Sequence, residues 1–542
     1  MRVLGINSVF HDPAAALVVD GKVVAAAEEE RFSRRKHGKR PVPFSAWEQP
    51  AAAARWCLRQ GGLEPADIDL IGFSYDPALA RPPEEMGLHD PWDHLRTVYA
   101  TQAPSFLAEE LPGLDPGRAR FVPHHVAHAA SAGLAVPGEN CSVLVCDGRG
   151  ERDSCLTGRY QARRLEVLGT QPLPHSLGLM YEDLTQHLGF LRSSDEYKVM
   201  ALASYGKPRF LDQVREQIRP VPGGGFRTDP VDWAELAPAR SPGEDLTEAH
   251  ADLAASIQRR LEEVLLALAG ELHARTGDRL LAMAGGTALN CVANTVLAER
   301  GPFQRVWVQP AAGDAGTALG AALHLAAVER DLAWSMTGAD LGRGFTEAEI
   351  EAALRTARLR YERPRDLAGE VAGVLAQDGI VAWFQGRSEY GPRALGCRSL
   401  LAHPGHRGNL DRLNDVKGRE KFRPVAPMVL ADRAAAIFSR GPLPSPYMLF
   451  VHDVAAGWQD RIPAVVHVDG TARVQTVDPD TQPLLAALLI SFEQRTGLPV
   501  LVNTSLNTAG RPMVDDIRDA LECFGATPID ALVIGPFLLR RS

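Results

Sequence analysis

FVPHHVAHAASAGLAVPGENCSVLVCD, residues 121–147, joins a helix pattern to a strand pattern. Pro123 is well placed to open a helix, on which His124 and His128 are four residues apart and therefore share one face. The small residues that follow, from Ala127 to Gly133, would let another element pack closely against this helix. The run SVLVCD then predicts a buried strand ending at Asp147. The stretch therefore predicts an α/β fold with polar residues gathered at a strand end.

Two imidazoles and a carboxylate at a strand end would form most of a site for a divalent metal, because open α/β sheets bind ligands where their strands end. The spacing alone leaves this open, since a chain with 16 histidines contains such pairs by chance. The alternative is a histidine-rich turn, with His125 and its neighbours exposed or satisfied in the core. The motif HExxH is absent, which excludes a zinc-protease helix.

Composition indicates a globular protein of more than one domain, with 542 residues, 45% of them hydrophobic and 23% charged. The formal net charge is −9, whereas a generic nucleic-acid binder more often carries a positive charge. We therefore expect no nucleic-acid partner. Any anionic ligand should be held locally, by clustered arginines and backbone amides.

Cysteine usage indicates a reducing compartment. The seven cysteines include no CxxC, which argues against a disulfide framework and a cysteine-based zinc module. The first residues, MRVLGIN, run straight into a strand pattern without a charged leader and apolar core, and no apolar run approaches the ~18 residues needed to span a bilayer. We expect a cytoplasmic location and no membrane partner.

A strand, a polar loop and a hairpin occur twice. Residues 2–7 predict a strand, and ALVVDGKVVAAAEEE predicts a hairpin around Asp20-Gly21. Residues 143–170 repeat the plan with the strand VLVCD, the loop GRGERDS and a second hairpin. This indicates an internally duplicated α/β domain with a ligand between its halves. Chance similarity of two such units is the alternative.

Two later strand–helix junctions carry glycines. Gly285-Gly286 in LLAMAGGTALN and the stretch GDAG around Asp314 would leave backbone N–H groups free to meet an anion. Because each junction also has a polar residue, Asn290 and Asp314, the pair favours a nucleotide cleft. The alternative is that the glycines serve only the turns. Asp314 could also stand beside Asp147 and complete a His₂Asp₂ ligand set.

Cations gather in two regions. The loop RFSRRKHGKR, residues 31–40, is either solvated surface or a loop that closes over phosphate. The pattern resets near Arg343, so we expect two domains, residues 1–344 and 345–542. In the second, short loops concentrate guanidinium and ammonium groups, which suit phosphate binding better than surface ion pairs: Arg387, Arg393, Arg398, Lys417, Arg419, Lys421, Arg423 and Arg473.

Ordered blocks along the whole chain resemble the O-carbamoyltransferases of natural-product biosynthesis, the family of the tobramycin carbamoyltransferase and of nodulation proteins of the NodU type. The blocks include GINSVFHDPAAALVVDGKVVAAAEEERFSRRKHG, HHVAHAAS, VCDGRGE, YKVMALASYG, AGGTALN, PAAGDAGTALGAA, GRSEYGPRALGCRSLL, KGREKFRPVAP, RVQTV and VNTSLN. The resemblance implies an N-terminal duplicated domain of the actin/sugar-kinase/Hsp70 type, like a threonylcarbamoyl transferase. A C-terminal YrdC-like α/β domain would follow.

The same resemblance implies the site residues. The metal ligands would be His124, His128, Asp147 and Asp314, with iron(II) or another divalent ion. Carbamoyl phosphate and ATP, the latter with Mg(II), would be held in the second domain, and the nucleotide pocket of the first would be lined by Gly285, Gly286 and Asn290. The residues expected to hold carbamoyl phosphate and ATP are Arg393, Lys417, Arg423, Arg473, Asn503 and Ser505.

The implied reaction makes carbamoyl-adenylate and then transfers the carbamoyl group to a hydroxyl of a small molecule, such as a sugar or a glycosylated antibiotic, at the metal. His11 is the candidate to take the hydroxyl proton, with Asp12 beside it, because an imidazole titrates near neutrality. The alternative is that His11 only positions Asp12. Two competing readings are a tRNA threonylcarbamoyl-type transferase and a non-catalytic nucleotide-binding regulator.

Overall fold

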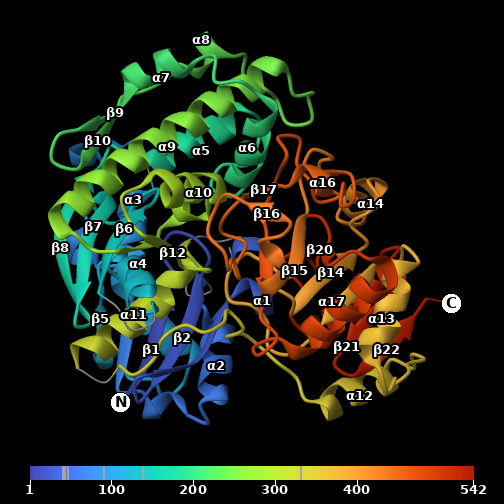
Figure 1. Cartoon of the computed structure of the whole chain (residues 1–542). Helices are drawn as coiled ribbons and strands as arrows, with labels where there is room; N and C mark the ends of the chain where they lie inside the picture. Colours follow the sequence, from blue (N-terminus) through green and yellow to red (C-terminus); the bar gives the residue numbers. More distant parts are fainter. Residues whose placement is uncertain (39–43, 45–47, 89–91, 137–139, 330–331, 542) are drawn as a thin grey trace. The chain divides into compact units, whose positions relative to one another are not determined.

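The chain forms two compact units in the computed structural model, Met1–Thr337 (unit 1) and Gly338–Ser542 (unit 2) (Figure 1). The structure describes residues 1–38, 44, 48–88, 92–136, 140–329 and 332–541. The division falls before the predicted 344/345 boundary because the segment 339–343 hydrogen-bonds into unit 2. Tyr390 N donates to Ala339 O at 2.7 Å, and Ser388 N donates to Arg343 O at 2.9 Å.

Unit 1 contains two five-stranded mixed sheets built on one plan. The first has the order β3-β2-β1-β4-β5, and the second, in the same sense, β8-β7-β6-β11-β12. In both, the first strand pairs antiparallel with one strand of a hairpin on one side and parallel with a later strand on the other, and that later strand pairs parallel with the edge strand. The strands are β1 (Arg2–Asn7), β2 (Ala14–Val19), β3 (Lys22–Glu28), β4 (Leu70–Phe73), β5 (Ala119–Phe121), β6 (Cys141–Cys146), β7 (Asp153–Gln161), β8 (Arg164–Pro172), β11 (Leu280–Ala284) and β12 (Arg305–Val308). The predicted duplication is confirmed, and its plan is that of an actin/sugar-kinase/Hsp70-like domain.

Both predicted hairpins are present. The first turns at Asp20 and Gly21, whose φ angles are 47° and 71°. The second turns at Ala162 and Arg163, with φ angles of 47° and 63°. Two consecutive positive φ angles match the twist of the flanking strands, which is why such tight turns close hairpins.

One helix closes each half of unit 1 and packs on the sheet of the other half. Helix α4 (His124–Gly133) follows β5 and packs on β6 and β11, whereas α11 (Ala315–Val328) follows β12 and packs on β1 and β2. The two helices also pack on each other, at a separation that needs small residues. A Cβ at Gly320 of α11 would lie 1.8 Å from the carbonyl oxygen of Ala127. The predicted small face of the 124–133 helix therefore serves this contact.

Other helices of unit 1 lie outside the sheets. The longest is α9 (Glu248–Thr276), which begins at the capping residue Thr247 and ends at Gly277 in the left-handed conformation. Helix α5 (Leu177–His187) and helix α6 (Glu196–Leu202) lie against it (Figure 1). Among the helices of the described residues, none combines the length and hydrophobicity that crossing a membrane requires.

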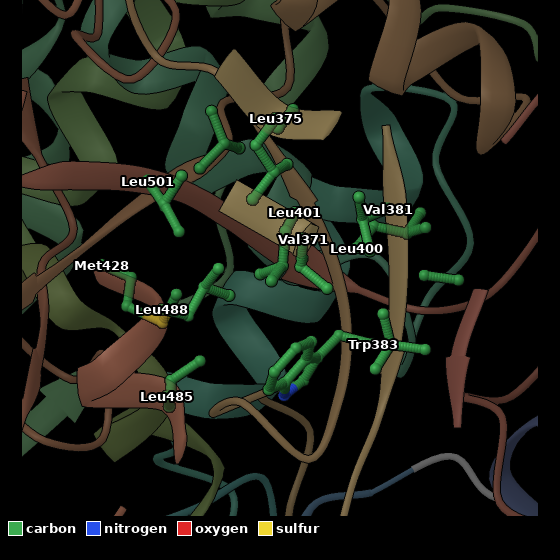
Figure 2. Close-up of a cluster of buried hydrophobic side chains, with 14 of the residues drawn as sticks. Val371, Leu375, Val381, Trp383, Leu400, Leu401, Met428, Leu485, Leu488 and Leu501 are labelled. Carbon is green, nitrogen blue, oxygen red and sulfur yellow. The ribbon is translucent and has the colours of Figure 1, made fainter. Parts of the chain in front are cut away.

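Unit 2 is an α/β unit around a seven-stranded mixed sheet of order β19-β15-β20-β14-β13-β21-β22. Its strands are β13 (Val381–Phe384), β14 (Arg398–Ala402), β15 (Ala426–Leu430), β19 (Gln475–Val477), β20 (Val500–Ser505), β21 (Ala531–Ile534) and β22 (Phe537–Arg540). Helices α13 (Leu367–Ala376) and α17 (Pro483–Thr496) pack together. Figure 2 shows the buried core between sheet and helices, with Trp383 from β13, Leu401 from β14 and Leu488 from α17.

Candidate active site

Four side chains of unit 1 converge on one point. His124 Nε2 lies 3.2 Å from Asp147 Oδ2 and 3.6 Å from Asp314 Oδ1. His128 Nε2 lies 3.3 Å and 3.5 Å from the same two oxygens. Four ligands arranged tetrahedrally at ~2.1 Å from a metal would be about 3.4 Å apart. The structure thus brings together the four residues proposed as ligands, at the spacing of a coordination shell.

The fold explains this convergence. His124 and His128 lie on successive turns of α4, Asp147 directly follows β6, and Asp314 directly precedes α11. Because α4 and α11 pack against each other, their N-terminal ends meet. The first half of unit 1 supplies two nitrogens, and the second half supplies two carboxylates.

Hydrogen bonds from neighbouring groups orient two of these side chains, His124 and Asp147. Nδ1 of His124 lies 3.1 Å from the carbonyl oxygen of Ser74, which can only accept, so Nδ1 carries a hydrogen and Nε2, which faces the carboxylates, is the nitrogen that a metal can bind. The amide of Gly286 donates to Asp147 Oδ1 at 2.9 Å, so Oδ2 faces the histidines. Such outer contacts are typical of metal ligands, whose tautomer and orientation they fix.

The electrostatics also favour a cation. The four side chains are at most 10% exposed. Burial lowers the pKa of His124, but hydrogen bonds to Asp147 and Asp314 and their charges raise it well above its ordinary value. Burial raises the pKa of Asp147, but the two histidines hold it well below its ordinary value. Among the described residues, neither ring nitrogen of His128 has a hydrogen-bond partner. A divalent ion fits these donors.

His125 does not join the centre. Burial and the neighbouring His124 lower its pKa to about 3, so it is neutral, and its ring packs on Gly150. The sequence patterns did not single out Glu151, which holds the start of α4: its Oε1 accepts from the amides of His124 and Asp76, both at 2.8 Å. The sequence did hold a clue to Glu151, because it is a second carboxylate four residues after Asp147, in the stretch DGRGE.

The loop that contains His11 follows β1, as the loop that contains Asp147 follows β6. Its Phe10 ring meets the His124 ring edge-on at a centroid distance of 5.3 Å. His11 Nδ1 is hydrogen-bonded to Asp12 Oδ2 at 2.9 Å. Asp12 has a φ angle of 45°, and Asn7 Nδ2 holds this turn by donating to the carbonyl oxygens of His11 and Asp12 at 2.7 and 3.0 Å.

The glycine junction differs from expectation. The amide of Gly285 donates to Ala312 O at 2.8 Å, and that of Gly286 donates to Asp147, so neither is free for an anion. Asn290 caps α10 (Cys291–Arg300) through the amide of Ala293 and bonds to Gln258 at 2.7 Å. Hydrogen bonds within the protein therefore occupy the two backbone amides and the Asn290 side chain that the sequence suggested for nucleotide binding.

Unit 2 buries a cation within a polar cluster. Lys417 Nζ donates to Ser505 Oγ at 2.8 Å and also contacts the carbonyl oxygen of Ser505 and Asn507 Oδ1. Burial, and then the charges of Arg419 and Arg423, hold the pKa of Lys417 well below its usual value. A bound anion would offset the repulsion between such closely spaced cations.

Asn503 and Ser505 lie on one face of β20 because side chains alternate along a strand. Asn503 Nδ2 donates to Gln475 Oε1 at 2.6 Å and to Ala394 O at 3.2 Å, which ties it to the loop of Arg393. Within the described residues, the buried Oδ1 of Asn503 has no hydrogen-bond partner. Arg473 lies two residues before Gln475 on the neighbouring segment.

Two cations expected at an anion site serve the fold instead, and a third, from the 31–40 loop, is also buried. Arg398 is fully buried and donates to the carbonyl oxygens of Gln385 and Arg343, both at 2.8 Å. Arg387 donates to the carbonyl oxygens of Gly342, at 2.9 Å, and Leu341. In the 31–40 loop, Arg31 is buried beside Glu28 at 3.4 Å. Lys39 and Arg40 of that loop lie outside the described residues.

Comparison with known proteins identifies the family. The models described as Carbamoyltransferase N-terminus and Carbamoyltransferase C-terminus match residues 2–81 with 114–323 and residues 372–541. Nodulation protein U of Sinorhizobium fredii is 44% identical over 96% of each chain, and nodulation protein NolNO of the same species is 37% identical over 99% of this chain and 80% of its own. The crystal structure of T. kodakarensis HypF aligns with 61% of this chain and 49% of its own at 15% identity, with a TM-score of 0.37, too low to support an argument about the fold. With the two family models covering most of its length, the chain belongs to the carbamoyltransferase family and is a carbamoyltransferase.

Proposed function

We propose that the protein is an ATP-dependent O-carbamoyltransferase that works in two stages. Unit 2, as a YrdC-like domain, converts carbamoyl phosphate, ATP and water into carbamoyl-adenylate, phosphate and pyrophosphate. Unit 1 then passes the carbamoyl group to a hydroxyl of a sugar or a glycosylated natural product such as an antibiotic, and AMP leaves. The observation that carries this proposal is the four-residue centre of unit 1 in a chain of this family.

His124, His128, Asp147 and Asp314 would hold a divalent ion, iron(II) or another, which when bound polarises the carbamoyl carbonyl as a Lewis acid. Ser74 and Gly286 support the centre by fixing the His124 tautomer and the Asp147 orientation. Gly285, Gly286 and Asn290 would lie behind the nucleotide rather than bind it through free amides. The amide of Gly286 holds Asp147, whereas Asn290 caps α10.

His11 would take the proton of the attacking hydroxyl at Nε2. Its Nδ1 faces Asp12, and an ionised carboxylate only accepts, so Nδ1 carries the hydrogen and Nε2 the lone pair. The Asn7 side-chain amide fixes the loop, so the His11 imidazole keeps its orientation. Orienting a base in this way raises its efficiency without changing its chemistry.

In unit 2, Arg393, Lys417, Arg423 and Arg473 would neutralise the phosphates of carbamoyl phosphate and of ATP with its Mg(II). Asn503 and Ser505 would complete the site with an amide and a hydroxyl. The crowding of cations around Lys417 supports this assignment, because it makes the cluster receptive to a phosphate dianion.

The proposal is tested with carbamoyl phosphate, ATP, Mg(II) and ferrous iron, and a panel of methyl glycosides and aminoglycosides screened by mass spectrometry for a gained carbamoyl group. His124→Ala should abolish transfer yet retain carbamoyl-phosphate-dependent pyrophosphate release. Arg423→Ala should abolish pyrophosphate release. Full transfer by His124→Ala would rule out the metal role, and unchanged pyrophosphate release by Arg423→Ala would rule out the phosphate site.

A further inference from the structure

A chain of hydrogen bonds leads away from His11 through residues that the proposed function does not use. Asp12 Oδ1 is 2.8 Å from His37 Nδ1, and its Oδ2 is 2.9 Å from His11 Nδ1. His37 Nε2 in turn is 2.7 Å from Ser194 Oγ, which is also 3.4 Å from Lys36 Nζ. One carboxylate is therefore shared by two imidazoles, and the outer imidazole is tied to a loop far away in sequence.

The donors and acceptors of this chain can be assigned. Because the ionised Asp12 only accepts, His37 Nδ1 carries a hydrogen and donates to Asp12 Oδ1. Lys36 only donates, so Ser194 Oγ accepts from it, and the hydroxyl hydrogen of Ser194 is available to His37 Nε2. Each Asp12 oxygen accepts one imidazole N–H. The distances of 2.8 and 2.9 Å are those of hydrogen bonds.

The surroundings confine this chain. Burial raises the pKa of Asp12, but His11 and His37 together hold it well below its ordinary value, so Asp12 is an anion. The charged groups near the two histidines include Glu30, whose Oε2 accepts from the His37 amide at 2.8 Å, and Lys36. The carboxyls of Glu182 and Glu196 interact electrostatically with His11. The rings of His11 and His37 lie 4.3 Å apart.

We propose that His37 and Ser194 are positioning residues that act through Asp12 to aim His11 and to limit how tightly it holds a proton. An unshared aspartate would stabilise the imidazolium form of His11. By donating to the second oxygen, His37 draws off part of that charge and so weakens the hold of Asp12 on the His11 proton. Ser194 holds His37 in the tautomer that can donate. This inference rests on the proposed function in taking His11 as the base.

The network itself is tested without any acceptor, by NMR of the full chain labelled with ¹⁵N-histidine. In the wild type, His37 should show a hydrogen on Nδ1 and none on Nε2. In His37→Leu, which removes the donor, the titration midpoint of His11 should rise by about one pH unit. In His37→Asn, whose amide keeps a donor near the Nδ1 position, it should stay near the wild-type value. In Ser194→Ala, the His37 Nε2 resonance should shift.

A matched control is His406→Asn, because His406 is an exposed histidine of unit 2 that also lies beside an aspartate, 3.9 Å from Asp378 Oδ1. It should leave the His11 titration unchanged. The proposal is overturned if wild-type His37 carries its hydrogen on Nε2, or if His37→Leu and His37→Asn shift His11 equally. If His37→Leu fails to fold, the tautomer of His37 in the wild type and the shift of the His37 Nε2 resonance in Ser194→Ala still test the proposal.

Activity then separates the two proposals. With a glycoside that the wild type carbamoylates, the acid limb of the kcat/KM profile should move to higher pH in His37→Leu and return in His37→Asn, whereas a purely structural defect would lower the rate at every pH. Absence of carbamoylated product from the wild type would sink the proposed function. It would leave the NMR result on the network standing.

Discussion

The backbone amide of Gly286 and the carboxylate of Asp147, 139 residues apart in sequence, meet at 2.9 Å. The bond fixes which oxygen of Asp147 faces the histidines. It also explains the glycine, because a Cβ at position 286 would lie 3.0 Å from Asp147 Oδ1. The junction that the sequence offers as a nucleotide loop thus supports the four-residue centre of His124, His128, Asp147 and Asp314.

Gly286→Ala should therefore weaken metal binding, by roughly 10- to 100-fold, because it pushes Asp147 away from its position. Calorimetric titration with Mn(II), which resists oxidation, measures the effect. Gly270→Ala is the matched control, since no atom lies within 4 Å of a Cβ at that position of α9. Equal affinities for the two variants would contradict the support role.

Metal affinity should rise with pH. His124 and the carboxylates share protons in the metal-free protein, and the raised pKa of His124 means that this imidazole is protonated at pH values where an ordinary one is neutral. An ion must displace that proton, so binding is weakened as pH falls through the His124 pKa. Titrations between pH 5.5 and 8.5 at constant ionic strength (a range chosen around the ordinary imidazole pKa of about 6.5) measure the slope. A flat profile would show that the histidines are not ligands.

Anion binding to unit 2 should take up protons. The pKa of Lys417 is lowered by burial and by Arg419 and Arg423, and a bound dianion would raise it. Sulfate is a suitable probe because its charge is constant near pH 8.5, and calorimetry in buffers of different ionisation heat counts the protons. Lys417→Arg should bind sulfate without proton uptake, because a guanidinium stays charged throughout. Uptake that persists in Lys417→Arg would place the titrating group elsewhere.

Arg398→Met should destabilise unit 2 rather than weaken phosphate binding. Arg398 stacks on Phe384 at 3.7 Å and satisfies buried carbonyl oxygens that methionine leaves without a donor. A cost of about 3 kcal/mol is expected, visible as a lower unfolding temperature. Arg518→Met is the control, since the Arg518 side chain is 85% exposed and pairs only at the surface with Glu522, at 2.8 Å. Similar unfolding temperatures for the two variants would contradict the structural role of Arg398.

Local patterns sufficed for the elements, whereas the full set of four residues was implied by the family resemblance. The helix of His124 and His128 and the strand before Asp147 follow from periodicity and from proline placement, which depend on neighbouring residues alone. The duplication could be recognised because each half repeats a strand, a loop and a hairpin in order. Asp314 could be proposed because it stands in the glycine-containing stretch GDAG at a strand–helix junction.

Roles set by long-range contacts could not be predicted. Ser74 acts through its carbonyl oxygen, which any residue would supply, so no side-chain signal marks it. Arg393 and Arg398 stand in the same arginine-rich stretch of sequence, yet Arg398 begins β14 and is buried among backbone carbonyl groups. Likewise, nothing in the basic 31–40 loop distinguishes His37, whose partner Ser194 lies 157 residues away.

Because α4 brings the nitrogens from one half of unit 1 while Asp147 and Asp314 bring the oxygens from the other, an ion bound here would act as a clasp between the two halves. Neither half could then open without releasing it, so metal loading should slow backbone hydrogen exchange in both sheets at once.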